Sequence, residues 1–371
     1  MRVLYFSRGY TSHDHRFLAA LGETGHEVFY LRLEPGRPGE ESRPVPPKVR
    51  VVGWPGGGRP WRWTGVARRR AVLRRVLDEV QADLVHAGPV QRGALLTALA
   101  GFRPLVTMSW GSDLLLEARG GLGRWAARYT LARSAALICD CQTVRRAAQE
   151  LGMPEERIVV SPWGVDLRHF SPGGGGGLRS RLGWESSFVI LSTRSWEPIY
   201  GVEVLVEAFI RAARVEPSLR LLALSGGSLR PQIEGMLSRA GLADRVRFLG
   251  QVAYDELPAC YRAADVYISA SRCDGSSVSL LEAMASGLPG IVSDIPANRE
   301  WVEPGVNGWW FRDGDAAALA ESILTASRAG KGLKEMGKRS RETAEARADW
   351  RQNFPALLRA YEVARPMGKD R

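Results

Sequence analysis

The chain has 371 residues, more than one hydrophobic core usually supports, so two domains of ordinary size are expected. Hydrophobic residues make up 45% of it and charged residues 25%, a globular composition that excludes a largely disordered chain. The formal net charge of +11 is concentrated in residues 1–165, which contain 24 Lys and Arg but only 15 Asp and Glu. This half is therefore expected to attract anionic partners.

Several other classes of protein are disfavoured by what the sequence lacks. No apolar run is long enough to span a membrane, and the start MRVLYFSRGY resembles a first β-strand, not a signal peptide. The four cysteines are too few for a disulfide framework and lack zinc-site spacing. The basic residues form no recognisable nucleic-acid-binding module. We therefore expect a cytoplasmic protein that does not bind nucleic acid.

The first half alternates short apolar runs with segments of helix length. The runs expected to be strands are residues 2–7, 27–33, 83–88, 104–110, 135–140 and 157–161. This alternation predicts βαβ units and a mostly parallel sheet. The first unit lacks the G-x-G-x-x-G fingerprint, which disfavours a dinucleotide-binding enzyme, although Gly9 can let a ligand approach the backbone.

Polar residues follow two of these strands. His13, Asp14 and His15 are the densest polar cluster of the first half, and they either face a ligand or form a helix start capped by Ser12 or Asp14. Trp110 and Asp113 come directly after another strand, again at a carboxyl end.

Residues 34–65 are rich in Pro and Gly, and residues 56–63 are expected to form a mobile loop. The loop leads into a basic amphipathic helix over residues 67–80. Trp61 and Trp63 before this helix suggest contact with a membrane surface. The apolar stripe is narrow, however, and Asp78 and Glu79 offset the arginines, so we favour a helix that packs on its own domain.

The second half repeats the same alternation after a predicted linker at residues 170–177, which ends in five glycines. Strands are expected at residues 188–193, 219–225, 246–250, 265–270 and 290–293. Two doubly wound halves that face each other would bring their strand ends into one cleft, the default position of a ligand site.

The stretch from Cys273 to Pro289 follows one of these strands and carries the strongest functional signal. Ser276 or Ser277 can cap the helix that follows, whose first amides and dipole favour a phosphate. Glu282 lies one turn after Val278 and shares its helix face. The alternative is an ordinary capped helix with a glutamate facing solvent.

Together these residues resemble the retaining glycosyltransferases of family 4, two-domain enzymes of GT-B architecture that use nucleotide-sugar donors. The most specific match is Asp274-Gly275, with Glu282-Ala283-Met284-Ala285 eight residues after the aspartate, followed by Gly287 and Pro289. Further matches are Gly25-His26-Glu27-Val28, Trp163-Gly164-Val165-Asp166, Phe248-Leu249-Gly250, Ala264-Asp265-Val266 and Asn307-Gly308. The resemblance spans nearly the whole chain and is stronger after residue 150.

The resemblance implies roles for individual residues. Arg194, Asp274 and Glu282 would be catalytic: Arg194 would bind the diphosphate, Asp274 the hydroxyls of the transferred sugar, and Glu282 those of the ribose. The other implied donor-binding residues are Gly9, Asp113, Tyr200, Gly250, Val252, Gly275, Ser276, Ser277 and Val278. The residues expected to contact the acceptor are His13, Asp14, His15 and Trp110.

Three positions depart from the family pattern. Asp274 stands where the family usually has Glu, Tyr200 where it has a phosphate-binding Lys, and Trp110 where many members have His. Arg194 would then be the main side-chain counter-charge for the leaving group. Asp113 or the loop of residues 13–15 could replace the contacts of the missing His.

The resemblance implies neither a metal ion nor a cofactor, because the nucleotide-sugar is a co-substrate. The acidic pair Asp313 and Asp315 stands just before a predicted helix, where a turn and an N-cap explain it. Residues 1–165 would bind the acceptor, with a helix at about 351–366 crossing back onto them, and residues 166–350 would bind the donor.

The expected function is transfer of a sugar, with retention of configuration, to a glycan or lipid-linked acceptor. The basic first half adds an anionic membrane surface as an expected partner on the cytoplasmic side. Two alternatives stay open: a non-catalytic binding or scaffold protein, and a GT-B sugar-nucleotide epimerase.

Overall fold

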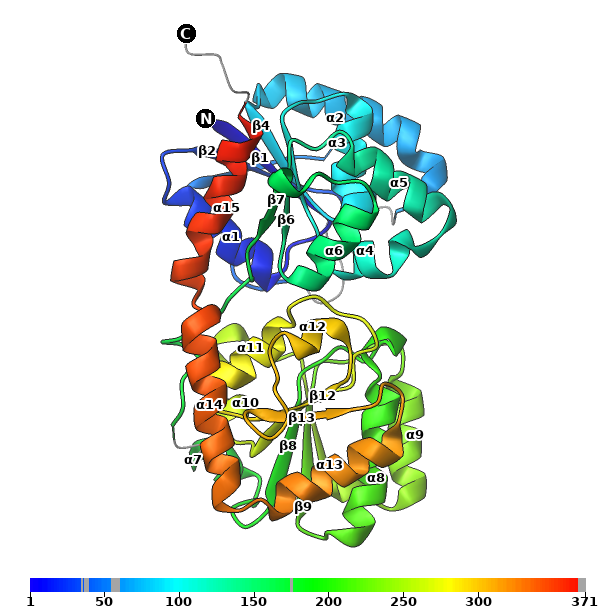
Figure 1. Cartoon of the computed structure of the whole chain (residues 1–371), viewed down its shortest axis with the longest axis vertical. Coiled ribbons are helices and arrows are strands. Elements are labelled where there is room, and N and C mark those ends of the chain that lie inside the picture. Colours follow the sequence, from blue (N-terminus) through cyan, green and yellow to red (C-terminus); the bar gives the residue numbers. More distant parts are fainter. Residues whose placement is uncertain (35, 37–39, 55–60, 174–175, 366–371) are drawn as a thin grey trace. The chain divides into compact units, whose positions relative to one another are not determined.

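The computed structural model describes residues 1–34, 36, 40–54, 61–173 and 176–365. Its contacts divide the chain into two units, Met1–Pro162 with Asn353–Arg371, and Trp163–Gln352 (Figure 1). Each unit is built on one parallel sheet covered by helices, so the prediction of two Rossmann-like α/β domains is confirmed. No helix in the described part of the chain is both long enough and apolar enough to cross a bilayer.

The first unit has a seven-stranded sheet in the order β3-β2-β1-β4-β5-β6-β7. Its strands are β1 (Arg2–Ser7), β2 (Glu27–Arg32), β3 (Val49–Val52), β4 (Leu84–Ala87), β5 (Leu105–Met108), β6 (Ala136–Cys139) and β7 (Ile158–Val160). The central strands are almost wholly buried, as expected for a parallel sheet covered on both faces.

The helices of the first unit lie on both faces of this sheet (Figure 1). They are α1 (Ser12–Gly22), α2 (Val66–Val80), α3 (Leu95–Ala100), α4 (Ser112–Leu115), α5 (Gly121–Leu131), α6 (Gln142–Glu150) and α15 (Trp350–Ala364). Short turns complete it at η1 (Trp63–Gly65), η2 (Val90–Ala94), η3 (Glu117–Arg119) and η4 (Glu155–Arg157). From Asn353 onward α15 belongs to this unit, and the hydroxyl of Tyr361 lies 2.9 Å from Nδ1 of the buried His86 on β4.

Helix α2 packs on its own domain, as favoured from the sequence. Its residues Leu73, Val76, Leu77 and Val80 are all buried in the core beneath it. Within the Pro- and Gly-rich residues 34–65, Val49–Val52 forms the edge strand β3, which was not predicted. Residues 56–60 of the predicted mobile loop lie outside the described residues.

The second unit has a six-stranded sheet in the order β10-β9-β8-β11-β12-β13. Its strands are β8 (Phe188–Ser192), β9 (Leu219–Leu224), β10 (Val246–Gly250), β11 (Val266–Ser269), β12 (Gly290–Ser293) and β13 (Gly308–Phe311). Its helices are α7 (Gly176–Arg181), α8 (Val202–Val215), α9 (Arg230–Ala240), α10 (Leu257–Arg262), α11 (Val278–Ala285), α12 (Pro296–Arg299), α13 (Ala316–Arg328) and α14 (Lys331–Arg347), with short turns η5 (Pro198–Tyr200), η6 (Ala243–Arg245) and η7 (Tyr254–Glu256).

The prediction that the glycine-rich stretch joins the two halves is wrong for its described residues. Gly173, Gly176 and Gly177 belong to the second unit, and the chain passes from one unit to the other after Pro162. A Cβ atom on Gly173 would lie 3.2 Å from the side chain of Arg262, so this part of the stretch runs against α10.

Two details of the second unit follow from local chemistry. The side chain of Asp315 accepts hydrogen bonds from Ala317 N and Ala318 N, so it is the N-cap of α13, as predicted. Helix α14 runs so close to the turn at Gly287 that a Cβ on Gly337 would collide with the Gly287 carbonyl oxygen. Glycine is therefore required at position 337 by close approach.

Candidate functional site

The predicted donor residues Arg194, Tyr200 and Asp274 to Ser277 lie where the strand order of the second sheet reverses, whereas Gly9 and Asp113 belong to the first unit. Strand β8 lies between β9 and β11, so the loops that leave β8 and β11 diverge to opposite sides. Such a switch point is where doubly wound sheets bind ligands. The loop after β8 carries Arg194 and Tyr200, and the loop after β11 carries Asp274 to Ser277.

Arg194 is the centre of this group. Its Nη2 lies 2.7 Å from Oδ2 of Asp274, and both side chains are largely buried, 12% and 16% exposed. Its Nη1 donates hydrogen bonds to Oγ of Ser277 at 2.9 Å and of Ser279 at 3.3 Å. The guanidinium also lies over the ring of Tyr200, with Cζ 4.1 Å from the ring centroid. The phenol at position 200 thus supports the cation.

The Arg194–Asp274 pair is an ion contact, and its hydrogen bonding is incomplete. Asp274 Oδ2 and Arg194 Nε are both buried and lack a hydrogen-bond partner among the described residues. Asp274 Oδ1 accepts the N–H of Gly275 at 3.1 Å. Unsatisfied buried polar atoms are uncommon in native proteins, so each needs an explanation, and a catalytic or binding role is one of them.

Burial and charge act in opposite directions on this pair. Burial lowers the pKa of Arg194, but the carboxylate of Asp274 and the nearby tyrosines outweigh it and raise the pKa above the ordinary value. Burial raises the pKa of Asp274, and the Arg194 guanidinium offsets only part of that rise. Arg194 is therefore a permanent cation, fixed in place on three sides.

Glu282 is held by a buried tyrosine. The hydroxyl of Tyr261, on α10, donates a hydrogen bond to Oε2 of Glu282 at 2.7 Å. Tyr267, on β11, hydrogen-bonds Oγ of Ser279 at 2.7 Å, and Ser279 in turn accepts from Arg194. Two buried phenols thus fix the two charged side chains from beneath.

Helix α11 begins at Val278, with Ser277 at its N-cap position, but the expected side-chain cap is absent. The hydroxyl of Ser277 bonds to Arg194 and makes no cap hydrogen bond. The predicted capping role of Ser277 is therefore wrong, and its hydroxyl instead ties the helix start to the cation. Ser276 is buried and accepts the indole N–H of Trp301 at 3.0 Å.

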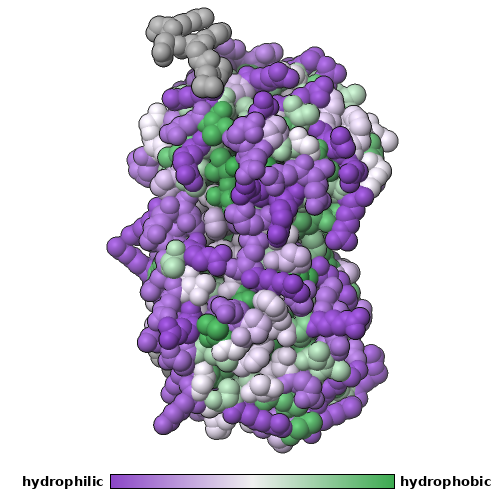
Figure 2. Space-filling view, viewed as in Figure 1, coloured by the Kyte–Doolittle hydropathy of each residue, from purple (hydrophilic) through white to green (hydrophobic). Residues whose placement is uncertain are grey.

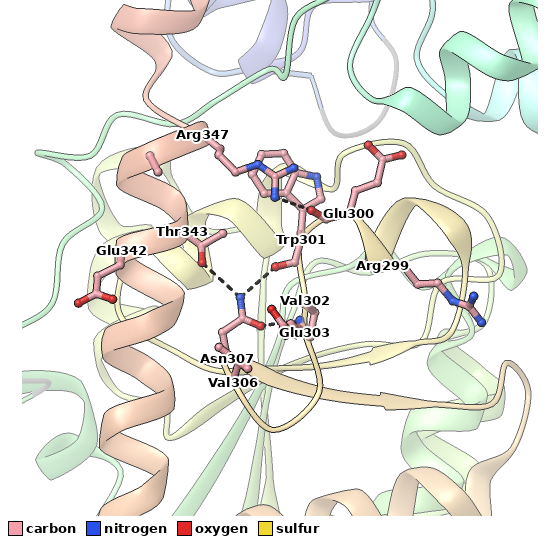
Figure 3. Close-up of a pocket in the computed structure, with 11 residues that line it drawn as sticks. Arg299, Glu300, Trp301, Val302, Glu303, Val306, Asn307, Glu342, Thr343 and Arg347 are labelled. Atoms are coloured by element: carbon pink, nitrogen blue, oxygen red, sulfur yellow. Dashed lines mark hydrogen bonds between the residues drawn. The ribbon is translucent and has the colours of Figure 1, made fainter.

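Trp301 also lines a surface hollow of ≈ 470 Å³ in the second unit (Figure 3). The guanidinium of Arg347 lies 4.5 Å from its ring centroid, and the amide of Asn307 joins its carbonyl to Thr343. None of the predicted donor residues lines this hollow. It lies behind the turn at Ser276, with Trp301 between them.

Of the residues that the family resemblance places beside the base, Leu249 and Gly250 end β10 and Val252 follows it. Gly250 has φ +68° and its carbonyl accepts the N–H of Ser225, which also has a left-handed backbone. Val252 is half-buried and packs against the core beneath it. The left-handed conformation explains why glycine occupies position 250.

In the first unit, the cluster at residues 13–15 is largely internal. Thr11 is the N-cap of α1 and Asp14 completes a capping box, so the expected cap at Ser12 or Asp14 is corrected to Thr11. Asp14 is buried and also accepts the hydroxyl of Tyr5 at 3.0 Å. Burial raises the pKa of Asp14 to about 6, against the hydrogen bonds from Thr11 and Tyr5 that lower it.

The two histidines of this cluster have different surroundings. Nδ1 of His15 lies 2.7 Å from the hydroxyl of Tyr10, and burial lowers the pKa of His15. The ring of His13 lies 5.6 Å from the ring of Trp110, which brings two of the predicted acceptor residues together.

Asp113 holds the backbone of its own unit together. It is buried, and its carboxylate accepts hydrogen bonds from Ser109 Oγ and from the N–H groups of Val90, Trp110 and Leu114. These four hydrogen bonds give Asp113 a structural role, and its expected contact with the nucleotide-sugar stays a prediction. The carbonyl of Gly9 is likewise engaged, by the hydroxyls of Ser7 and Tyr30.

Sequence reasoning missed four residues of the second-unit site: Ser279, Tyr261, Tyr267 and Trp301. Each lies within or beneath the group of Arg194, Asp274 and Glu282, or holds its loop. The only sequence signal of Tyr261, Tyr267 and Trp301 is that a buried Tyr or Trp needs a hydrogen-bond partner, which does not say which partner, and Ser279 carries no such signal.

Comparison with known proteins was made on sequence and on structure. The family model described as Glycosyltransferase Family 4 matches residues 8–169, and the one described as Glycosyl transferases group 1 matches residues 187–328. A D-inositol 3-phosphate glycosyltransferase of Geodermatophilus obscurus is 32% identical over 230 residues, 59% of this chain and 50% of that one. A phosphatidyl-myo-inositol mannosyltransferase of Mycobacterium leprae is 33% identical over 183 residues, 48% of this chain and 47% of that one.

The chain spans about half the length of these curated relatives. Among solved structures, Anabaena HepE in complex with UDP-glucose superimposes with a TM-score of 0.81 at 20% identity, covering 98% of this chain and 100% of that one. This likeness establishes the GT-B fold for the chain, in agreement with the expectation from its sequence.

Proposed function

Because the chain belongs to glycosyltransferase family 4, whose models match both of its halves, we propose that it is a retaining glycosyltransferase. It takes a sugar from a nucleotide-sugar donor and transfers it to a glycan or lipid-linked acceptor. The observation that carries the proposal is the fixed cation Arg194, paired with Asp274 and Ser277 at the switch point of the second sheet, with Glu282 on the helix α11 that follows.

Each residue has a role in donor binding. Glu282, oriented by Tyr261, accepts hydrogen bonds from the ribose hydroxyls. Arg194 and the first amides of α11 bind the diphosphate, and Gly250 and Val252 border the base. Asp274 binds hydroxyls of the sugar, and as the diphosphate arrives it shares Arg194 with that anion.

The chemistry follows from where charge develops. As the bond from the sugar to the diphosphate breaks, negative charge grows on the leaving oxygen, beside a cation and amides that are already in place. The acceptor hydroxyl attacks from the same face and loses its proton to the leaving phosphate, so the configuration is retained. Neither a metal ion nor a cofactor takes part in this proposal.

The acceptor is proposed to contact the first unit. His13 and Trp110 lie together there, and this half carries a net charge of +9. Two relatives are named for an inositol phosphate and a phosphatidyl-inositol acceptor, which favours an anionic or lipid-linked acceptor. The protein would then work on the cytoplasmic side of an anionic membrane.

A panel of nucleotide-sugars tests the proposal, by isothermal titration followed by a donor-hydrolysis assay. Wild-type protein should bind one donor and release free sugar slowly, whereas Arg194→Ala and Glu282→Ala should lose turnover while remaining folded. Glu207→Ala, which removes an exposed glutamate from a helix pair with Arg211, is the matched control and should keep full activity.

Three results would count against the proposal. Binding of no nucleotide-sugar, or binding without any hydrolysis, would favour a non-catalytic binding protein. Conversion of the donor to an epimer without an acceptor would favour an epimerase. Near-normal turnover by either site variant would remove that residue from the mechanism.

A further inference from the structure

Helix α5 has an apolar outer face that the described residues of its unit leave exposed. Its inner residues Ala126, Ala127, Thr130 and Leu131 are buried. On the opposite face, Leu122 is 50% exposed and Trp125 is 49% exposed. Leu116, in the turn that precedes α5, is 42% exposed. Figure 1 places α5 at the outer edge of the first unit.

The exposed aromatic side chain is rigid. The rings of Trp125 and Tyr129 stack with centroids 5.3 Å apart, and the guanidinium of Arg133 lies 3.6 Å from the centroid of Tyr129. A tryptophan held in this way can enter an interface without losing much conformational freedom.

The same face is strongly basic, and the exposed Glu117 at its margin is paired with Arg92. Arg119, Arg124 and Arg128 are exposed around Leu122 and Trp125, and no Asp or Glu occurs from residue 118 to residue 139. In Figure 2, polar residues lie beside pale and apolar ones along the edge of the first unit where Figure 1 places α5. Helix α14 is basic too, but there arginines pair with glutamates one turn away. Only a strongly anionic partner matches the charge of the α5 face.

Helix α2 was the candidate for membrane contact from the sequence, but it lacks one of the two signals. Its large apolar residues are buried in its own unit. Reversible membrane binding is strong only where buried apolar area and basic charge act together, and α5 has both.

The tryptophan segment before α2 lies beside the same region. The ring of Trp61 lies 5.3 Å from the guanidinium of Arg92, and Arg92 pairs with Glu117 of η3 at 3.0 Å. Trp63 next to it is 36% exposed. The tryptophans therefore lie near the turn that leads into α5.

We propose that the α5 surface docks the protein on an anionic lipid bilayer. The α5 surface is defined by residues Leu116, Arg119, Leu122, Arg124, Trp125 and Arg128. Trp125 and the leucines would lie at the level of the headgroups, and the arginines would contact lipid phosphates. The choice of a lipid partner rests on the proposed function, because a lipid-linked acceptor would lie in that bilayer.

Co-sedimentation of the purified full chain with vesicles tests this surface. Vesicles of phosphatidylcholine with phosphatidylglycerol should bind the wild-type protein, more weakly as salt rises, and vesicles of phosphatidylcholine alone should not. One basic residue near an anionic leaflet strengthens binding by about fivefold, so Arg124→Gln with Arg128→Gln should weaken it by roughly 20-fold. Trp125→Ser should weaken binding even at low salt.

The matched control is Lys338→Gln with Arg339→Gln on α14, which removes the same charge from an exposed surface and should leave vesicle binding almost unchanged. The proposal is overturned if wild-type protein does not bind anionic vesicles, or if the control pair weakens binding as much as the α5 pair. It is also overturned if Trp125→Ser leaves vesicle binding intact but dissociates a dimer on gel filtration, because α5 would then contact a second copy.

Donor hydrolysis without acceptor separates this inference from the proposed reaction. All α5 variants should hydrolyse the soluble donor as wild type does. If the wild-type protein bound vesicles but hydrolysed no donor, the proposed sugar transfer would be refuted and the proposed docking surface would be supported. If it hydrolysed donor but did not bind vesicles, the reverse would hold.

Discussion

Replacing Asp274 with asparagine tests whether Arg194 is the diphosphate-binding cation. The substitution keeps the shape of the side chain but leaves a buried guanidinium without its counter-charge, 2.7 Å away in the wild-type protein. Removing one partner of a buried ion pair costs about 3–5 kcal/mol. For a domain of this size each kcal/mol lowers Tm by about 2–4 °C, so a fall of at least roughly 6 °C is expected.

A nucleoside diphosphate should reverse much of this loss. In the variant the ligand becomes the counter-charge of Arg194 and no longer meets the Asp274 carboxylate, so we expect it to bind about tenfold more tightly, a gain of about 1.4 kcal/mol. Thermal melts and titrations with the nucleoside diphosphates of the donor panel measure both effects. Turnover of the nucleotide-sugar should nevertheless fall, because the sugar hydroxyls lose their acceptor.

Asp265→Asn is the matched control. It removes the partner of Arg179, 2.8 Å away in an ion pair at the start of β11, at the opposite end of the strand from Asp274. This control should also lose stability, but the nucleoside diphosphate should raise its Tm only as much as it raises that of wild type. If Asp274→Asn behaved like Asp265→Asn toward the ligand, the diphosphate would not bind at Arg194.

Three further predictions test the support of the fold and site. Tyr261→Phe removes the hydrogen bond to Glu282 but keeps the ring, so it should lower Tm by at least about 3 °C, the value of one hydrogen bond to a charged group. Because Glu282 is then no longer oriented, nucleotide binding should weaken by roughly tenfold, and equal affinity in a titration would contradict the role of Tyr261. Burial lowers the pKa of His86 to about 3, so the folded state excludes a proton that the unfolded chain binds below about pH 6.5. The free energy of unfolding should therefore decrease below that pH, by up to about 1.4 kcal/mol for each pH unit. Urea unfolding at pH 7.5 and pH 5 should show this loss in the free energy of unfolding for wild type and a smaller loss for His86→Asn. An equal loss in the two proteins would refute the role of His86. Gly337→Ala should lower Tm, because the added methyl group collides with the turn before β12. Gly332→Ala on the same helix meets open space and should raise stability by up to about 1 kcal/mol. Thermal melts in which both variants shift Tm in the same direction would contradict the close approach at Gly337.

The two parallel sheets, most of their strands and the place of the predicted donor residues follow from the sequence, because they depend on patterns that tertiary packing does not change, whereas the strand order does not. Continuous apolar runs separated by helix-length segments define two parallel sheets, and residues just after such runs lie at carboxyl ends. The position of Arg194 and Asp274 at one sheet edge is therefore predictable from the sequence. Their partnership is not, since a spacing of 80 residues in the chain carries no information on distance.

The features that could not be predicted from the sequence depend mainly on which of several possible partners a polar side chain hydrogen-bonds. Ser277 has the residue type and position of a cap, but a charged donor nearby forms the stronger hydrogen bond, so the hydroxyl turns to Arg194. Asp14 and Asp113 looked available for ligands, and burial with several internal donors turned both to structural roles. Strand β3 was missed because it is an edge strand with two exposed residues between Pro-rich and Gly-rich segments.

The path of the chain through the two units has a consequence for synthesis on the ribosome. The second unit is continuous in sequence, whereas the first needs residues from Asn353 onward, including Tyr361 against His86. The unit that begins first is thus the last to be completed, since its closing helix leaves the ribosome only after the whole second unit. Until then, nascent chains expose the surface of the first sheet that α15 will cover, and this is where a chaperone would be expected to bind.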